Sequence, residues 1–241
     1  MSAGVVLAIC GLRAQSTDNP GEPPVIAHPN NPPAAPEFNN ERILGVIPNF
    51  QTVNDPQAPY RPLTVKQKFK LFARETVDPF TFAGAAMGAG LSHADNDDPL
   101  YGQGGGAYAE RFGAAVADIA TQNFFSDFLL ASLLHEDPRY FRRGPEYSFL
   151  SRTGYALSRI AITRTDSGHS SFNFAGIGGM GMGIGLSDAY YPHRSVNAPE
   201  FGSRVITSLI SAAMGNLLPE FWPDIQQKFF HRHHHQPAGT P

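Results

Sequence analysis

The stretch 107–136, AYAERFGAAVADIATQNFFSDFLLASLLHE, is the longest part of the chain that can form one helix. It contains no proline, and Asp137-Pro138 follows it directly. Because proline disfavours the α conformation in the residue before it, the helix is expected to end at this dipeptide. The sequence therefore predicts a mainly α protein in which this helix is the longest.

Prolines also mark the expected ends of the helices on either side of this helix. Thr64 is a typical N-cap residue, and the apolar spacing after it predicts a helix that ends at Asp78-Pro79. No run of alternating β-branched residues competes with a helical interpretation. Further helices are expected at 80–94, 148–163, 172–190 and 200–218, the last ended by Leu218-Pro219. The predicted fold is a bundle of five or six helices packed through glycine.

Glycines four residues apart mark two of the predicted helices, a spacing that lets two helix backbones approach closely. Residues 167–187 carry no formal charge, and about 20 such residues suffice to cross the hydrocarbon core, so a membrane span stays open. An extended conformation of GMGMGIG also stays open. The residues expected at close helix contacts are Gly84, Gly88, Gly179, Gly181, Gly183 and Gly185.

Composition and the N-terminal residues point to the cell envelope. Charged residues make up 16% of the chain, against a usual ~25%, and a net charge of -3 argues against nucleic-acid binding. The apolar run in residues 4–16, GVVLAICGLRAQS, resembles the end of a signal peptide, so residues 1–15 are interpreted as its remnant and the protein as exported. Lipidation of Cys10, the single cysteine, is an alternative.

Three further segments follow from composition. Residues 16–62 hold eleven of the 21 prolines and few apolar residues, which predicts a disordered Pro-rich tether with a short docking strand at 42–50. Residues 63–225 form the predicted helical domain. Residues 226–241 form a His-rich disordered tail.

Six arginines follow the long helix and are the main charge feature: Arg139, Arg142, Arg143, Arg152, Arg159 and Arg164. Guanidinium groups match the oxygens of carboxylates and phosphates. One interpretation pairs them with the acidic loop at 95–98 and with Glu136 and Asp137. The other has them bind anionic lipid head groups.

Asp127 is the most notable carboxylate of the long helix. It lies on one side of the helix with Gln122, Asn123 and Ser126, among Phe124, Phe125, Phe128 and Leu129. A carboxylate among aromatic residues can have a raised pKa and a function. A solvated or Arg-paired face is the alternative.

Three short motifs resemble those of the type 2 phosphatidic acid phosphatases. Arg152 and Arg159 have the spacing of the first motif, and Ser167-Gly168-His169 fits the second. Ser203-Arg204 begins the third, but Ile210 and Met214 stand where that family has its nucleophilic His and its Asp. The resemblance implies a phosphate site with His169 as proton donor, in a divergent or degenerate lipid phosphatase.

A broader resemblance covers residues 63–230. The motifs DPFTFAG, LHEDPRYFRRG, ITRTDSG, YYP and FWPD are similar to those of an uncharacterised family of exported proteins of environmental bacteria. This resemblance implies a location and a helical fold but no chemistry.

The combined expectation is an exported, membrane-associated envelope protein with a non-catalytic structural or interaction role. A lipid phosphatase and a protein that binds an anionic lipid or small ligand are the alternatives. No cofactor is expected. No metal is expected either, because the three consecutive side chains of His135-Glu136-Asp137 cannot all face one ion. The expected partner is a membrane lipid or envelope component, and homo-oligomerisation stays open.

Overall fold

The computed structural model describes residues 38, 40–57, 59–96, 99–189 and 198–230. Most of the predicted Pro-rich tether, Cys10 and the His-rich end lie outside these residues. The described chain is mainly helical, as predicted. The helices are α1 (Val65–Thr76), α2 (Pro79–Asp95), the 3₁₀ turn η1 (Pro99–Tyr101), α3 (Gly105–Asn123), the π-helix η2 (Phe124–Leu130), α4 (Ala131–Leu133), α5 (Phe149–Ser158), α6 (Phe174–Ser187), α7 (Ala198–Gly215) and α8 (Leu217–Phe230).

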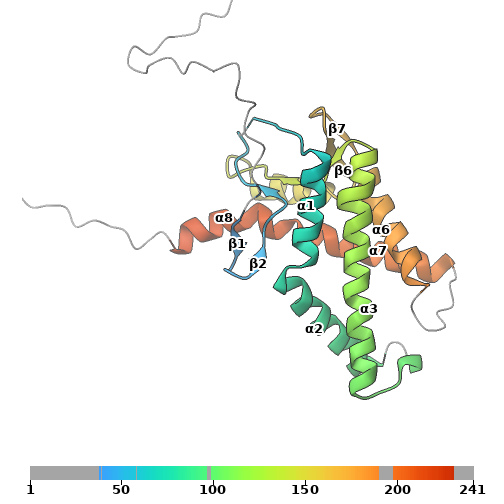
Figure 1. Cartoon of the computed structure of the whole chain (residues 1–241). Helices are drawn as coiled ribbons and strands as arrows, with labels where there is room; N and C mark the ends of the chain where they lie inside the picture. The colour runs from blue at the N-terminus through green and yellow to red at the C-terminus, as the bar shows by residue number, and fades with distance from the viewer. Residues whose placement is uncertain (1–37, 39, 58, 97–98, 190–197, 231–241) are drawn as a thin grey trace, which may run out of the picture. The chain divides into compact units, whose positions relative to one another are not determined.

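The predicted long helix forms the centre of the fold. It runs through α3, η2 and α4, and α2, α1 and α6 pack along it (Figure 1). It ends earlier than predicted, because His135 has a positive φ of 55° and the chain then enters strand β4 (Glu136–Asp137). The π-helix interrupts the α geometry at Asp127, and such segments are frequent at functional sites.

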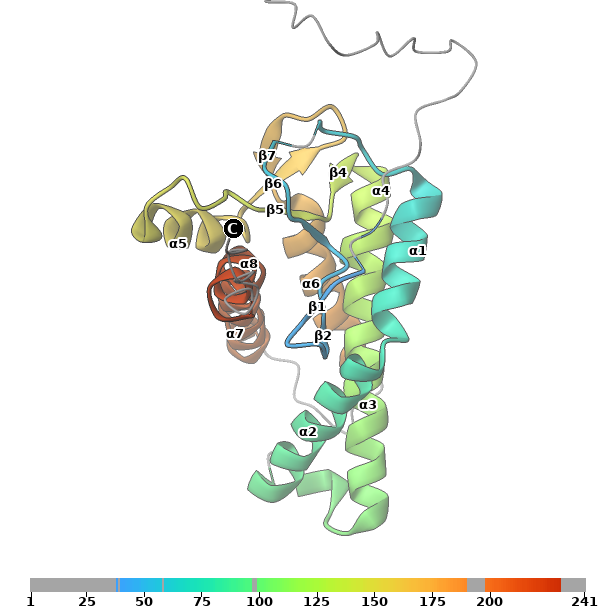
Figure 2. The same ribbon diagram turned by 90° about the vertical axis from the view of Figure 1, so that its left-hand side faces the viewer.

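The first two helices begin and end where the sequence predicts. Thr64 and Gln67 form a reciprocal capping box at the start of α1. Asp78 caps α2 through the backbone N–H of Phe80, and Pro79 occupies its first turn. α2 lies beside the first part of α3, and α1 lies beside its later part (Figure 2).

Glycine allows close packing at only some of the predicted positions. A Cβ atom at Gly179 would overlap the backbone of Ser126, and one at Gly183 would overlap Gln122. Here α6 therefore touches η2 and α3 without side chains between them. The close contact predicted at the other four positions is not seen among the described residues: a Cβ atom at Gly181 or Gly185 would lie 4.0 Å from Phe201, and one at Gly84 or Gly88 would meet open space.

Residues before Leu63 belong to the folded body, which differs from the predicted boundary. Strands β1 (Arg42–Ile43) and β2 (Ile47–Pro48) form an antiparallel hairpin. Strand β3 (Thr52–Val53) pairs in parallel with β5 (Tyr140–Phe141), so the docking strand exists but lies just after 42–50. Phe50, Leu63 and Leu71 form a buried cluster beneath it.

A β-hairpin replaces the predicted end of the helix at 148–163. α5 ends at Ser158, and strands β6 (Ile162–Thr165) and β7 (Ser170–Phe172) follow, with β6 also pairing with β4. Ile162, Thr163 and Thr165 of β6 are β-branched residues, which suit a half-exposed strand. Ser167 and His169 thus lie in a hairpin turn rather than at a helix start.

Two side chains cap the start of α6. The Asn173 side chain accepts from the Gly176 N–H, and the buried Glu136 carboxylate accepts from the Ala175 N–H at 2.9 Å. Asp166, in the turn between β6 and β7, accepts two hydrogen bonds from the buried Lys68 ammonium, at 2.8 and 2.9 Å.

The chain continues as a helix beyond Leu218-Pro219. α7 ends at Gly215, and Pro219 lies in the first turn of α8, where the absence of an N–H costs no hydrogen bond. α8 extends to Phe230 and so includes residues expected in the disordered tail. None of the described helices is both long and apolar enough to cross a membrane; of 167–187, only 174–187 is helical.

Candidate functional site

A cavity of about 290 Å³ lies between the central helix and the small sheets. η2 and the end of α3 form one wall, strands β4, β5 and β6 another, and the remaining walls come from α6 and the ends of α5 and α7. Its polar lining residues are Gln51, Gln122, Asn123, Ser126, Asp127, Glu136, Asp137, Arg139, Tyr140, Tyr155, Arg159, Thr163, Arg164, Asn173 and Asn216.

A pair of carboxyl groups lies on the central-helix side of this cavity. Asp127 of η2 lines the cavity, and Glu75 of α1 lies behind it. The Gln51 amide joins them, donating to Glu75 Oε2 at 2.8 Å and to Asp127 Oδ2 at 3.3 Å. The Ser126 hydroxyl lies 3.1 Å from Asp127 Oδ1. Among the described residues, neither carboxyl forms an ion pair.

Burial raises the pKa of Asp127 to about 7, although the hydrogen bonds from Ser126 and Gln51 partly oppose the rise. Burial, and then the charge of Asp127, raise the pKa of Glu75 well above its usual range. The raised pKa fits the hypothesis of a perturbed Asp127. Among the described residues, the side-chain partners of Asp127 are an amide and a hydroxyl, and none is an arginine.

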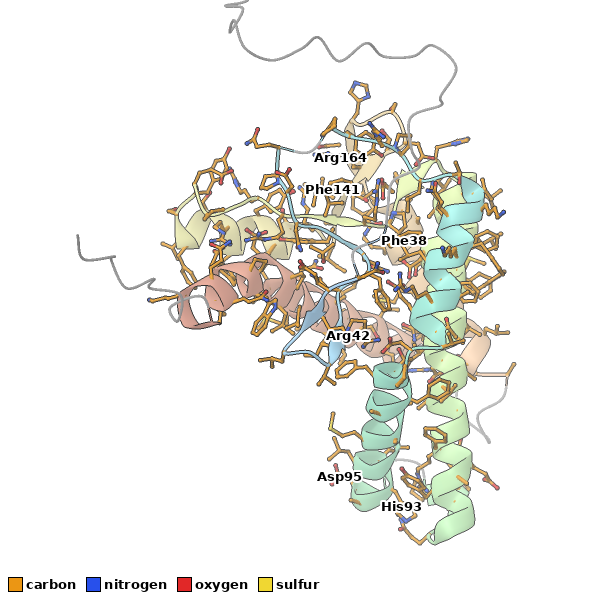
Figure 3. The ribbon with its side chains drawn as sticks, turned by 60° about the vertical axis from the view of Figure 1, so that its left-hand side comes forward. Phe38, Arg42, His93, Asp95, Phe141 and Arg164 are labelled. Carbon is orange, nitrogen blue, oxygen red and sulfur yellow. The ribbon has the colours of Figure 1, made fainter. Side chains whose placement is uncertain are left out.

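Two arginines line the cavity without an acidic partner. Arg159, at the end of α5, stacks on Tyr155 at 4.5 Å, and its Nε is buried without a hydrogen-bond partner. Arg164 of β6 stacks on Phe141 at 4.3 Å (Figure 3). It also lies 5.2 Å from the ring centre of Tyr60. In the described part of the chain, no carboxylate contacts either guanidinium.

The other four arginines of the predicted basic group have different surroundings. Arg139 pairs with Asp137, which one interpretation predicts. Arg142 and Arg152 are buried against Glu220 and Asp224 of α8, which neither interpretation predicts. Arg143 stacks on Tyr147 at 4.2 Å. Because Arg142 and Arg152 are buried and paired, these six residues do not form one basic surface for lipid head groups.

The motif residues shared with the phosphatases do not assemble one site. Arg152 is bound to α8, and Arg204 pairs with Asp188 at 2.8 Å. His169 is exposed, outside the cavity that Arg159 lines, and its Nδ1 lies 3.1 Å from the Ser167 hydroxyl. Only Arg159 of this set faces the cavity.

Comparison with protein-family models, with curated proteins and with solved structures gave no match.

Sequence reasoning missed Gln51 and Glu75. Both residues come from other segments of the chain, and Gln51 lies 76 residues before Asp127 in the sequence. No local sequence motif marks contacts of this kind. No group of three or more metal-ligating side chains occurs among the residues that the structure describes.

Proposed function

We propose that this protein binds a small anionic molecule in the cavity lined by Arg159. The buried Nε of Arg159, which has no hydrogen-bond partner among the described residues, is the observation that carries the proposal. A buried polar group without a partner costs about 1–3 kcal/mol, and more when it is charged. A carboxylate or phosphate oxygen in the cavity would remove this cost and is the usual partner of a guanidinium.

The rest of the cavity fits such a ligand. Asn123, Asn173 and Asn216 offer amide groups that can orient a polar molecule, while Phe141 and Met180 supply apolar contacts. Its volume of about 290 Å³ lies at the lower end of the range of ligand pockets, which favours a metabolite-sized ligand over a whole lipid. The role proposed is binding rather than catalysis.

The test is the binding of simple carboxylates, from acetate to hexanoate, and of inorganic phosphate, followed by NMR titration. We expect Arg159→Gln to weaken the binding of the best probe at least tenfold, because one charge-assisted hydrogen bond contributes about 1.5–3 kcal/mol. Arg143→Gln is the matched control, because Arg143 also stacks on Tyr155, at 5.4 Å, but lies outside the cavity. The proposal fails if no probe binds, or if both variants weaken binding equally.

A second proposed function, contact with a lipid surface, is favoured by α2. This helix carries no Lys or Arg, and only part of its surface packs on α3. Met87 is 69% exposed, Leu91 61% and Phe82 40%, so an apolar stripe faces outward. Exposed apolar side chains that gather on one surface mark sites of contact with a membrane or another protein. Together with the apolar run at residues 4–16, this supports the proposal of an exported, membrane-associated protein.

Flotation of the purified protein with phosphatidylcholine vesicles tests the lipid contact. We expect Met87→Asp together with Leu91→Asp to reduce the bound fraction severalfold, since each exchange removes apolar contact and adds a charge at the interface. Leu150→Asp is the control, because Leu150 is 80% exposed on α5, away from α2. Equal loss in the control, or no binding by the parent, would remove the lipid proposal.

A further inference from the structure

We infer that the ligand of this cavity is a zwitterion of amino-acid type, with its carboxylate on Arg159 and its ammonium group on Asp127, which Glu75 supports from behind. This inference rests on the proposed function, because it assigns the second end of the same ligand. It requires that the cavity offer a guanidinium without a carboxylate partner and a carboxyl group without a basic partner among the described residues.

The acidic end meets this requirement. Asp127 and Glu75 receive hydrogen bonds from Gln51, and the Ser126 hydroxyl adds a neutral donor to Asp127. Of the elements packed against η2, α4 and α6 carry no charged residue, while α3 carries Glu110, Arg111 and Asp118. The α1 helix carries Glu75 and four basic residues. Lys68 is bound to Asp166 and to the Ala131 carbonyl, Lys70 lies over Phe38, and Arg74 donates to Asn40 and lies over Phe50. An ammonium group would therefore supply the missing positive charge.

The basic end faces the same cavity, yet the two ends do not pair with each other. Arg159 and Asp127 both line the cavity, and no hydrogen bond or ion pair joins them in the structure. An unpaired guanidinium removed from water is costly, and burial without a basic partner disfavours the charged form of Asp127. A ligand that carries both an anionic and a cationic group would relieve both costs. A zwitterion does this, whereas a simple anion satisfies only Arg159.

The amide groups between the ends leave the ligand's orientation to these charges. Gln122, Asn123, Asn173 and Asn216 can each donate or accept a hydrogen bond, so they do not select the sign of the ligand charge. Glu136 and Asp137 also line the cavity, but Glu136 accepts from the Ala175 N–H and Asp137 is paired with Arg139. Asp127 is thus the carboxyl group of the lining that remains for an ammonium group.

Four probes of matched size test the inference by NMR titration: pentanoate, 2-aminopentanoate, 5-aminopentanoate and pentylamine. We expect one of the two amino acids to bind the parent protein at least tenfold more tightly than pentanoate. In Asp127→Asn this advantage is lost while pentanoate binding is retained. Glu110→Gln is the control, because Glu110 is an exposed carboxylate of α3 outside the cavity, and it should keep the advantage.

The outcomes distinguish a failure of the inference from a failure of the proposed function. If pentanoate binds through Arg159 and an amino group gives no advantage, the inference is wrong and anion binding stands. An advantage that persists in Asp127→Asn also overturns the inference, because the ammonium group would then bind elsewhere. If none of the four probes binds, both the inference and the proposed function fail.

Discussion

Replacing Glu220 by alanine is expected to lower the free energy of unfolding by about 3–5 kcal/mol. Glu220 is fully buried, and its carboxylate accepts from Tyr140 Oη at 2.7 Å, Arg152 Nε at 2.8 Å and the Arg143 N–H at 3.0 Å. Without it, the buried guanidinium of Arg152 keeps only Asp224 as a carboxylate partner. Removing one partner of a buried ion pair leaves an uncompensated charge, which is the costly case.

Urea denaturation of the purified protein measures this loss. Gln227→Ala is the matched control, because Gln227 is an exposed residue of the same helix and its exchange should change stability by less than about 0.5 kcal/mol. If Glu220→Ala and Gln227→Ala unfold at the same urea concentration, α8 does not pack on Arg142 and Arg152 as the structure has it.

Replacing Gly179 by alanine is expected to lower the free energy of unfolding by about 1–3 kcal/mol. The added Cβ atom would overlap the backbone of Ser126 and Phe125, which cannot move aside as a flexible side chain can. The two helices must separate at η2, next to Asp127, so ligand binding should weaken as well.

Gly181→Ala is the control for this exchange and is expected to act in the opposite direction. A Cβ atom at Gly181 would lie 4.0 Å from Phe201, which is an ordinary contact. Alanine in a helix is favoured over glycine by about 0.5–1 kcal/mol, so Gly181→Ala should raise the thermal midpoint slightly. Equal thermal midpoints for the two variants would contradict the close contact between α6 and η2.

Local signals in the sequence account for most of the helical fold. Thr64, Asp78-Pro79 and the uninterrupted stretch after Ala107 mark helix starts and stops, and the structure has helices there. The local signals failed where one residue type can mark either of two structures. Pro219 can end a helix or begin one, and in the structure it lies in the first turn of α8.

The candidate site was predictable only in part. Asp127 could be recognised because its aromatic neighbours are adjacent in sequence. Arg159 could be recognised as one of six arginines. Which of the six has an Nε without a hydrogen-bond partner could not be predicted, because it depends on tertiary contacts such as the pairing of Arg152 with Glu220 of α8. Glu75 and Gln51 needed the packing of α1 and the β3 segment against η2, a long-range contact without a local pattern.

A crystal structure of the protein with 4-bromobenzoate would test anion binding in the cavity most directly, since bromine can be located by its anomalous scattering. We expect the bromine peak inside the cavity, with a carboxylate oxygen about 2.7–2.9 Å from a nitrogen of the Arg159 guanidinium. An empty cavity at saturating 4-bromobenzoate, or a carboxylate bound only at sites away from Arg159, would contradict the proposed function.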